Sequence, residues 1–283
     1  MKIITQMNEM RSIVKDIKSQ GMSIGFVPTM GYLHEGHLSL VRESLRKADV
    51  TVVSIFVNPA QFGPREDFKE YPRDLNRDSD ILKREGVDYL FTPVTDEMYP
   101  GGYKTNVEVH DLQDKLCGRS RPGHFRGVCT VVLKLFNIIN PDISFFGQKD
   151  AQQEIILKRM VQDLNLEMKI EVLPIIREED DLALSSRNTY LSQEERKAAL
   201  SLSKSLKEAQ SMIENGQRDS EAIIKRMIEI INMEPLAKID YVEIVDLDKL
   251  NPVTRIEKEA LVALAVFIGE VRLIDNTILR TKE

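Results

Sequence analysis

The first half of the chain alternates short apolar runs with longer segments in which apolar residues recur every three or four positions. The short runs have strand length and β-branched character, whereas the longer segments have the period of a helix. The pattern predicts strands over 23–27, 50–57, 88–92, 143–147 and 169–175 and helices over 7–20, 37–48, 73–86, 127–140 and 150–164. Strands that alternate with helices predict an α/β fold, a doubly wound parallel sheet with helices on both faces.

The pattern changes near residue 177, where the polar and irregular stretch REEDDLALSSRN begins. A long helix is predicted over 192–216, with a capping box formed by Ser192 and Glu195 at its start and Gly216 at its end. Another helix and strands near 238–246, 260–269 and 271–275 follow. We therefore predict two domains, a parallel-sheet domain over 1–176 and a smaller α+β C-terminal domain over 177–283.

Composition and charge narrow the class of protein. The chain has 283 residues, a length typical of two domains, and 30% of them are charged, as in globular proteins. The net charge of −6 argues against a protein that binds nucleic acid stably, because such proteins usually carry a basic surplus. We expect Cys117 and Cys129 to be free thiols in a reducing compartment. No signal-like segment and no apolar run of ~20 residues is present, so we expect a cytoplasmic protein without membrane contact.

Three polar motifs follow predicted strands: PTMGYLHEGH, NPAQFGP and GQKD. In doubly wound sheets, ligands bind beyond the carboxyl ends of the strands. We therefore expect these three motifs to share one site.

His34 and His37, two of the four histidines, stand three positions apart at the start of a predicted helix. One explanation is structural, since a histidine there can cap the helix or pack in the core. A metal site is a second explanation, but no third ligand stands nearby in the sequence. A third explanation is an anion site, because the pair projects from the first turn, where free N–H groups and the helix dipole favour phosphate, and Gly31 and Gly36 allow close approach. We favour hydrogen bonds from both histidines to triphosphate oxygens.

Four companion segments each allow a structural or a functional interpretation. Asn58 and Gln61 are neutral amides suited to a small hydroxylated acid, within a loop rich in turn formers. RSRPGHFRGV (119–128) suits a carboxylate or phosphate, or is a basic surface loop. FFGQKDAQQ (145–153) is an ordinary helix start or a nucleotide-binding turn, and LSSRN (184–188) is a turn or a clamp for a triphosphate.

The H-x-G-H signature within PTMGYLHEGH resembles that of the nucleotidyltransferase superfamily that includes the class I aminoacyl-tRNA synthetases. That signature names adenylyl or nucleotidyl transfer without naming a substrate. The ordered set PTMGYLHEGH, FVNPAQFGPREDFKEYPRD, RPGHFRGVCTVVLKLFNIINPD, FFGQKDAQQ and LSSRNTYLS is similar to the pantoate–β-alanine ligase family. The likeness covers nearly the whole chain and is densest over 26–191.

The resemblance implies a Rossmann-like sheet, a C-terminal lid domain and the AMP-forming, ATP-dependent ligation of pantoate to β-alanine through a pantoyl adenylate. It implies Mg²⁺ carried with ATP, without identifying a ligand for the metal, and a homodimer. The family's nucleotide contacts fall on Met30, Gly31, Tyr32, Leu33, His34, Glu35, Gly36 and His37, then on Gly147, Gln148, Lys149 and Asp150. Further nucleotide contacts fall on Ile176, Leu184, Ser185, Ser186 and Arg187.

The resemblance assigns catalytic roles to His34, His37 and Lys149, with His37 also a proton donor. It assigns Asn58, Gln61 and Gln153 to pantoate, with Gln61 also near β-alanine.

Three alternatives remain at this point. Another small-molecule nucleotidyltransferase of the superfamily would keep the nucleotide on its product and release no free AMP. An aminoacyl-tRNA synthetase fits less well, because the chain is short and acidic. A regulator that binds ATP without catalysis would explain the glycine-rich loops but not the full ordered set of motifs.

Overall fold

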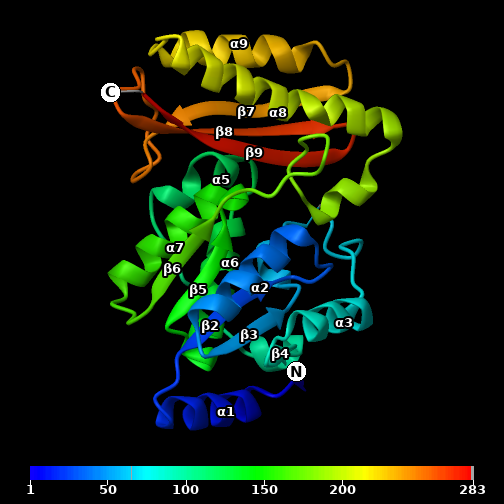
Figure 1. Cartoon of the computed structure of the whole chain (residues 1–283), viewed down its shortest axis with the longest axis vertical. Coiled ribbons are helices and arrows are strands. Elements are labelled where there is room, and N and C mark those ends of the chain that lie inside the picture. Colours follow the sequence, from blue (N-terminus) through cyan, green and yellow to red (C-terminus); the bar gives the residue numbers. More distant parts are fainter. Residues whose placement is uncertain (65, 282–283) are drawn as a thin grey trace.

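Two β-sheets organise the chain, of which the computed structural model describes residues 1–64 and 66–281 (Figure 1). The first sheet has six parallel strands in the order β1-β4-β3-β2-β5-β6, and the second has three antiparallel strands in the order β7-β8-β9. This arrangement confirms the predicted fold class. The strands are β1 (Lys2–Ile4), β2 (Ile24–Thr29), β3 (Val50–Ile55), β4 (Tyr89–Phe91), β5 (Ile143–Gly147), β6 (Lys169–Leu173), β7 (Ala237–Val245), β8 (Glu259–Ile268) and β9 (Val271–Arg280).

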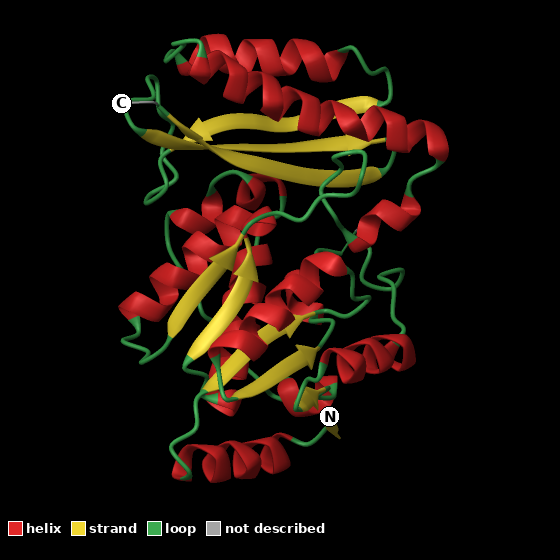
Figure 2. Ribbon diagram, viewed as in Figure 1, coloured by secondary structure: helices red, strands yellow, loops and turns green. Residues whose placement is uncertain are grey.

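The helices cover both faces of the parallel sheet and one face of the antiparallel sheet (Figures 1 and 2). Those of the first part are α1 (Met7–Ser19), α2 (Glu35–Lys47), α3 (Leu75–Glu85), α4 (Thr95–Met98), α5 (Cys117–Ser120), α6 (His124–Ile139) and α7 (Ala151–Asp163). Those of the second part are α8 (Gln193–Glu214) and α9 (Ser220–Asn232). Short 3-10 turns include η1 (Pro59–Gln61), η2 (Leu112–Asp114), η3 (Gln148–Asp150) and η4 (Ser186–Tyr190).

Neighbouring residues of the central strands enter different cores, because successive side chains of a strand point to opposite faces of a sheet. On β2, Phe26 packs into the core that includes α1 and α6, whereas Val27 packs into the core that includes α2 and α3. Val52 and Val53 of β3 divide in the same way. Burial on both faces explains why these strands read as continuous apolar runs rather than as alternating patterns.

The order of the strands creates a switch point between β2 and β5. The chain runs from β2 through β3 to β4 in one direction and from β5 to β6 in the other. Figure 2 shows the arrowheads of these strands pointing toward the C-terminal sheet. The carboxyl ends of the parallel strands, where ligands of this architecture bind, therefore face the second sheet.

The C-terminal sheet has its own core. One cluster of buried apolar side chains consists of residues between 182 and 279 and joins α8 and α9 to one face of β7–β9. Val245 and Leu261, in contrast, belong to the main core of the first part. The capping box of Ser192 and Glu195 is confirmed at the start of α8.

Some predicted boundaries are wrong. The helix predicted from 127 begins at His124, directly after Gly123 in the left-handed region (φ 82°). The strand predicted over 271–275 continues to Arg280, because β8 pairs with it along its whole length. The sequence pattern also missed β1, an edge strand of three residues that pairs with β4.

Cys117 and Cys129 are free, as predicted, and both are buried. In the ranges 1–64 and 66–281, no helix has the length and apolar content needed to cross a membrane.

Candidate active site

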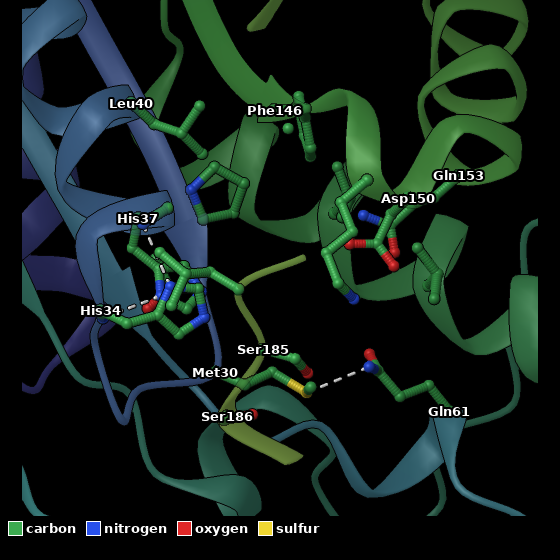
Figure 3. A pocket seen from close by; sticks show the side chains of 18 of the residues that line it. Met30, His34, His37, Leu40, Gln61, Phe146, Asp150, Gln153, Ser185 and Ser186 are labelled. Carbon is green, nitrogen blue, oxygen red and sulfur yellow. Dashed lines mark hydrogen bonds between the residues drawn. The ribbon is translucent and has the colours of Figure 1, made fainter. Parts of the chain in front are cut away.

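A cavity of about 250 Å³ lies at the carboxyl end of the parallel sheet. Its wall combines residues that follow β2, β3 and β5 with the start of α6 and the segment that leads to α8. Figure 3 shows His34 and His37 on one side and Asp150 and Gln153 on the other. The three motifs that follow predicted strands therefore do share one site.

The histidine pair forms a reciprocal cap at the start of α2. Nδ1 of His34 accepts a hydrogen bond from the backbone N–H of Gly36 (3.2 Å), and Nδ1 of His37 accepts one from the backbone N–H of His34 (3.3 Å). The two ring centroids lie 4.1 Å apart. A neutral imidazole that accepts at Nδ1 carries its proton on Nε2. The pair is thus both a helix cap and a pair of Nε2–H donors at the cavity.

The surroundings keep both histidines neutral. Burial, reinforced by the positive charge of Lys149, lowers the pKa of His34 to about 4. Burial, followed by the neighbouring His34 and by Lys149, lowers the pKa of His37 well below its usual value. Near neutral pH each neutral ring can therefore accept a hydrogen bond at Nδ1, as the cap requires, and donate one to an anion from Nε2–H.

The turn between β2 and α2 is held by a buried carboxylate. Asp78 of α3, only 1% exposed, accepts hydrogen bonds from the backbone N–H groups of Tyr32 (2.6 Å) and Leu33 (2.9 Å). Gly31 has φ 87°, and a Cβ there would lie 3.1 Å from a carboxylate oxygen of Asp78. Gly31 therefore shapes the turn, whereas Gly36 makes room for the ring of His34, whose atoms would lie 2.9 Å from a Cβ.

Six residues predicted to touch a ligand lie outside the cavity lining: Gly31, Tyr32, Leu33, Glu35, Gln148 and Asn58. Leu33 is fully buried in the core of the α2 side, and Glu35 forms an ion pair with Arg42 on the surface. The other predicted residues line the cavity: Met30, His34, Gly36, His37, Gln61, Gly147, Lys149, Asp150, Gln153, Ile176, Leu184, Ser185, Ser186 and Arg187.

Asn58 lies on the side of Gln61 that faces away from the cavity and holds its side chain by a hydrogen bond. Its amide nitrogen donates to Oε1 of Gln61 (3.0 Å) and to the carbonyl of Gly127 (3.1 Å), and its oxygen accepts from the hydroxyl of Tyr99 (2.8 Å). Asn58 is only 1% exposed, so these partners occupy its amide. Gln61, whose Nε2 lies 3.1 Å from the sulfur of Met30, is the amide that reaches the cavity.

Four polar cavity residues were given no role of their own from the sequence: Thr29, Tyr71, Arg121 and His124. His124 lies 2.8 Å from the carbonyl of Gln61 through Nδ1 and 3.0 Å from Nη1 of Arg121 through Nε2. Burial, followed by the charge of Arg121, lowers the pKa of His124 to about 4, so the neutral ring joins the two groups. The signal was the segment RSRPGHFRGV, whose functional and structural interpretations the sequence could not separate.

Acidic side chains of the loop between η1 and α3 neutralise two arginines of the cavity. Asp67 makes a two-pronged ion pair with Arg187 (2.8 and 2.9 Å), and Glu66 does the same with Arg121 (2.6 and 2.7 Å). Bidentate arginine–carboxylate geometry is the geometry that these side chains offer to a phosphate or a substrate carboxylate. Both arginines are therefore occupied by carboxylates of the chain itself, with which an anionic ligand would compete.

The cavity also has an apolar side. It is built by Phe56 after β3, by side chains of α6 and by the end of β5. Its members include Phe56, Val128, Val131, Val132, Leu135 and Phe146. The lining therefore suits a ligand that combines negative charge with a compact apolar group.

The chain matches the family model described as pantoate–β-alanine ligase over residues 2–278. It is similar to the pantothenate synthetase of Caldicellulosiruptor saccharolyticus, with 55% identity over 98% of this chain and 99% of the relative. It is also similar to the pantothenate synthetase of Thermotoga petrophila, with 56% identity over 99% of this chain and 100% of the relative.

Solved structures give the same result. A crystal structure of pantoate–β-alanine ligase (pantothenate synthetase) from Thermus thermophilus matches with a TM-score of 0.94 and 42% identity over 98% of this chain and 99% of the other. A pantoate–β-alanine ligase from Francisella tularensis, crystallised in complex with "Beta-gamma ATP" and β-alanine, matches with a TM-score of 0.81 and 37% identity, covering 98% and 97% of the two chains. Family model, sequence relatives and fold agree over nearly the whole length, and the chain belongs to the pantoate–β-alanine ligase family.

Proposed function

We propose that this chain condenses pantoate with β-alanine, using ATP and releasing AMP and pyrophosphate, in the biosynthesis of a coenzyme A precursor. Family membership supports the overall reaction. The observation that carries the assignment to this cavity is its mixed lining, which combines basic and N–H donor groups with apolar side chains and with two amides, Gln61 and Gln153. Pantoate has the matching shape, a compact dimethyl group beside a hydroxyl and a carboxylate.

In the first step a pantoate carboxylate oxygen attacks the α-phosphorus of ATP. An oxygen–phosphorus bond forms, and the bond to the bridging oxygen of pyrophosphate breaks. The Nε2–H groups of His34 and His37 would donate to the phosphate oxygens on which charge accumulates, and Lys149 would neutralise that charge. His37 would also serve as the proton donor: the negative charge of bound ATP would raise its pKa, and the protonated ring would then give its proton to the departing pyrophosphate. Ser185, Ser186 and Arg187 would hold the triphosphate from the segment that leads into the C-terminal part.

In the second step the amine of β-alanine attacks the acyl carbon of pantoyl adenylate. A carbon–nitrogen bond forms, the bond from carbon to the oxygen of AMP breaks, and the nitrogen loses a proton to solvent or to a phosphate oxygen. Gln61 and Gln153 would orient the pantoyl group, and Asn58 would act through Gln61.

Magnesium ions belong to this proposal as companions of ATP. Of the described residues that line the cavity, Asp150 is the one carboxylate, and the ranges 1–64 and 66–281 hold no cluster of three potential metal ligands. This donor set fits Mg²⁺, which is commonly bound by one or two carboxylates together with substrate phosphates and water. When bound, the ion would offset phosphate charge beside Lys149.

Three further proposals come from the family: a homodimer, a cytoplasmic location and a lid role for residues 177–283. The buried free thiols Cys117 and Cys129 are compatible with a reducing compartment. Light scattering of the purified chain would test the dimer.

The first experiment is isotope exchange between pyrophosphate and ATP, measured with Mg²⁺ and with or without pantoate, in the absence of β-alanine. We expect exchange only with pantoate, and AMP formation when β-alanine is added. H34A and H37A should each lower the exchange rate by about a hundredfold, in the range measured for loss of one preorganised donor. Exchange with a phosphate ester instead of pantoate, or ATP binding without exchange or AMP formation, would contradict the proposal.

A further inference from the structure

One side-chain amide of the C-terminal sheet, that of Asn276, contacts the turn that carries Lys149. Asn276 lies on β9, is only 4% exposed, and is separated by 127 residues from Lys149 in sequence. Figure 1 shows β9 next to the carboxyl ends of the parallel strands, above α5 and α7. Asn276 itself does not line the cavity.

The amide of Asn276 is bonded to the turn that carries Lys149. Its nitrogen donates to the backbone carbonyls of Gln148 (2.9 Å) and Lys149 (3.0 Å), and its oxygen accepts a hydrogen bond from the side chain of Gln148 (3.3 Å). This accounts for the position of Gln148, whose side chain turns to β9 while Lys149 and Asp150 turn to the cavity. Two carbonyls of one short turn thus depend on a single donor group.

The neighbouring Asp275 anchors the opposite wall. Its carboxylate makes a two-pronged ion pair with Arg177 (2.7 and 2.9 Å). Arg177 bridges to Ala183 in a hairpin whose ends, Ile176 and Leu184, line the cavity. Two adjacent residues of β9 therefore attach the C-terminal sheet to both sides of the site.

We propose that Asn276 is a positioning residue for Lys149, so that the C-terminal sheet sets the geometry of the adenylation step. The inference rests on the proposed function, because it assumes that Lys149 acts on the phosphates of ATP. Without the two bonds, the Gln148–Lys149 backbone is free to shift, and the ammonium group moves with it. Displacements of about 1 Å in such positioning contacts can cost about a hundredfold in rate.

The test compares Asn276→Leu, which keeps the size of the side chain and removes its donor, with Asn251→Leu as a control at an exposed contact between the two parts. Asn251 also connects the C-terminal part to the first part, through Lys115 (2.8 Å), but does not line the cavity. Pantoate-dependent pyrophosphate exchange reports the first step, and the reaction of β-alanine with preformed pantoyl adenylate reports the second.

We expect N276L to lower the turnover of exchange by about tenfold to a hundredfold, with the KM of pantoate and the second step unchanged, and N251L to leave all three unchanged. In a Lys149→Ala background, N276L should cause no further loss, because the group it positions is gone. Equal losses in both backgrounds, or an equal loss in the second step, would show a general structural role and overturn the inference.

If N276L does not fold, N276D replaces it in the same measurements, with and without Lys149→Ala. An aspartate keeps the shape of the side chain and, when ionised, cannot donate hydrogen bonds to the two carbonyls. Absence of pantoate-dependent exchange in the unmodified protein contradicts the proposed function. Unmodified exchange together with full activity of the Asn276 variant contradicts the inference alone.

Discussion

His34, His37 and His124 are all held neutral, and each has a defined partner for one ring nitrogen. The cost of burying a charge outweighs the proton affinity of the ring in each case, as their lowered pKa values show. The structural interpretation of the histidine pair as a cap and the functional one as an anion site are therefore not exclusive. Capping fixes Nδ1, and that leaves Nε2–H for the ligand.

Because folded His124 is neutral, we expect the free energy of unfolding to fall as the pH decreases from 6.5. Below that pH the unfolded chain protonates His124, whereas the folded chain, with the pKa of His124 near 4, does not. Stability then declines by up to about 1.4 kcal/mol per pH unit for this residue. Denaturant unfolding at pH 7, 6 and 5 should show a shallower decline in H124N, by about 2 kcal/mol at pH 5.

The exposed His110 provides the control: H110N should keep the decline of the unmodified protein. Equal slopes in H124N and the unmodified protein would contradict the neutral state of His124.

At the scale of elements, the loop between η1 and α3 packs against the start of the C-terminal part. Asp67 pairs with Arg187, the hydroxyl of Tyr71 lies 3.3 Å from that of Ser186, and the hydroxyl of Tyr190 donates to the carbonyl of Glu70 (3.2 Å). The site thus satisfies its own Arg187 with a carboxylate. A triphosphate that binds Arg187 must compete with Asp67.

We therefore expect D67N to bind ATP more tightly. Removing a competing carboxylate from a partly exposed pair is worth ~1 kcal/mol, or about fivefold in Kd. Isothermal titration with ATP and Mg²⁺ measures this directly. D80N, which removes an exposed charge from α3, controls for net charge and should change Kd little. Weaker binding in D67N would instead mean that Asp67 holds Arg187 in the orientation that phosphate needs.

At the scale of the whole molecule, the cavity lies between two sheets that are joined by apolar contacts, such as those of Val245 and Leu261 with the main core, and by polar ones. One polar contact is the ion pair between Asp275 of β9 and Arg177 in the segment after β6, in which the aspartate side chain is 2% exposed and the arginine side chain 25%. A buried pair contributes little net stability when intact, but losing one partner leaves a charge without compensation. Joining the sheets in this way ties their relative position to specific side chains.

At this scale we expect D275L to destabilise the protein by about 3 kcal/mol, because it leaves the partly buried charge of Arg177 without a partner. R177M/D275L should recover part of that loss, since an apolar pair needs no compensation. E259A, which breaks the exposed pair of Glu259 and Arg280 on the same antiparallel sheet, should change stability by less than about 1 kcal/mol. Equal effects of D275L and the double variant in thermal and denaturant unfolding would contradict this account.

The pattern along the chain by itself determined the alternation of strands and helices, the class of the first sheet and the order of the motifs. Burial of both faces of β2 and β3 leaves a continuous apolar run in the sequence, and the end of each run marks where a loop that lines the cavity begins. Such features can be found in the sequence, because the periodicity of a helix or strand and the burial of its faces show in residues that are close together along the chain. Family resemblance then identified 14 of the 30 residues that line the cavity, from Met30 to Arg187.

Only the tertiary structure decided which polar residues reach the cavity and which hold others in place. Asn58 and Gln61 read alike in sequence, yet packing against Gly127 and Tyr99 places Asn58 behind Gln61. Asp78 and Asn276 carry no local signal, because their partners lie 45 and 127 residues away. The three residues of β1 also gave no signal for a strand, since so short an edge strand forms only by pairing with its neighbour β4. Contacts between distant segments depend on how whole elements pack, and no pattern of neighbouring residues records that packing.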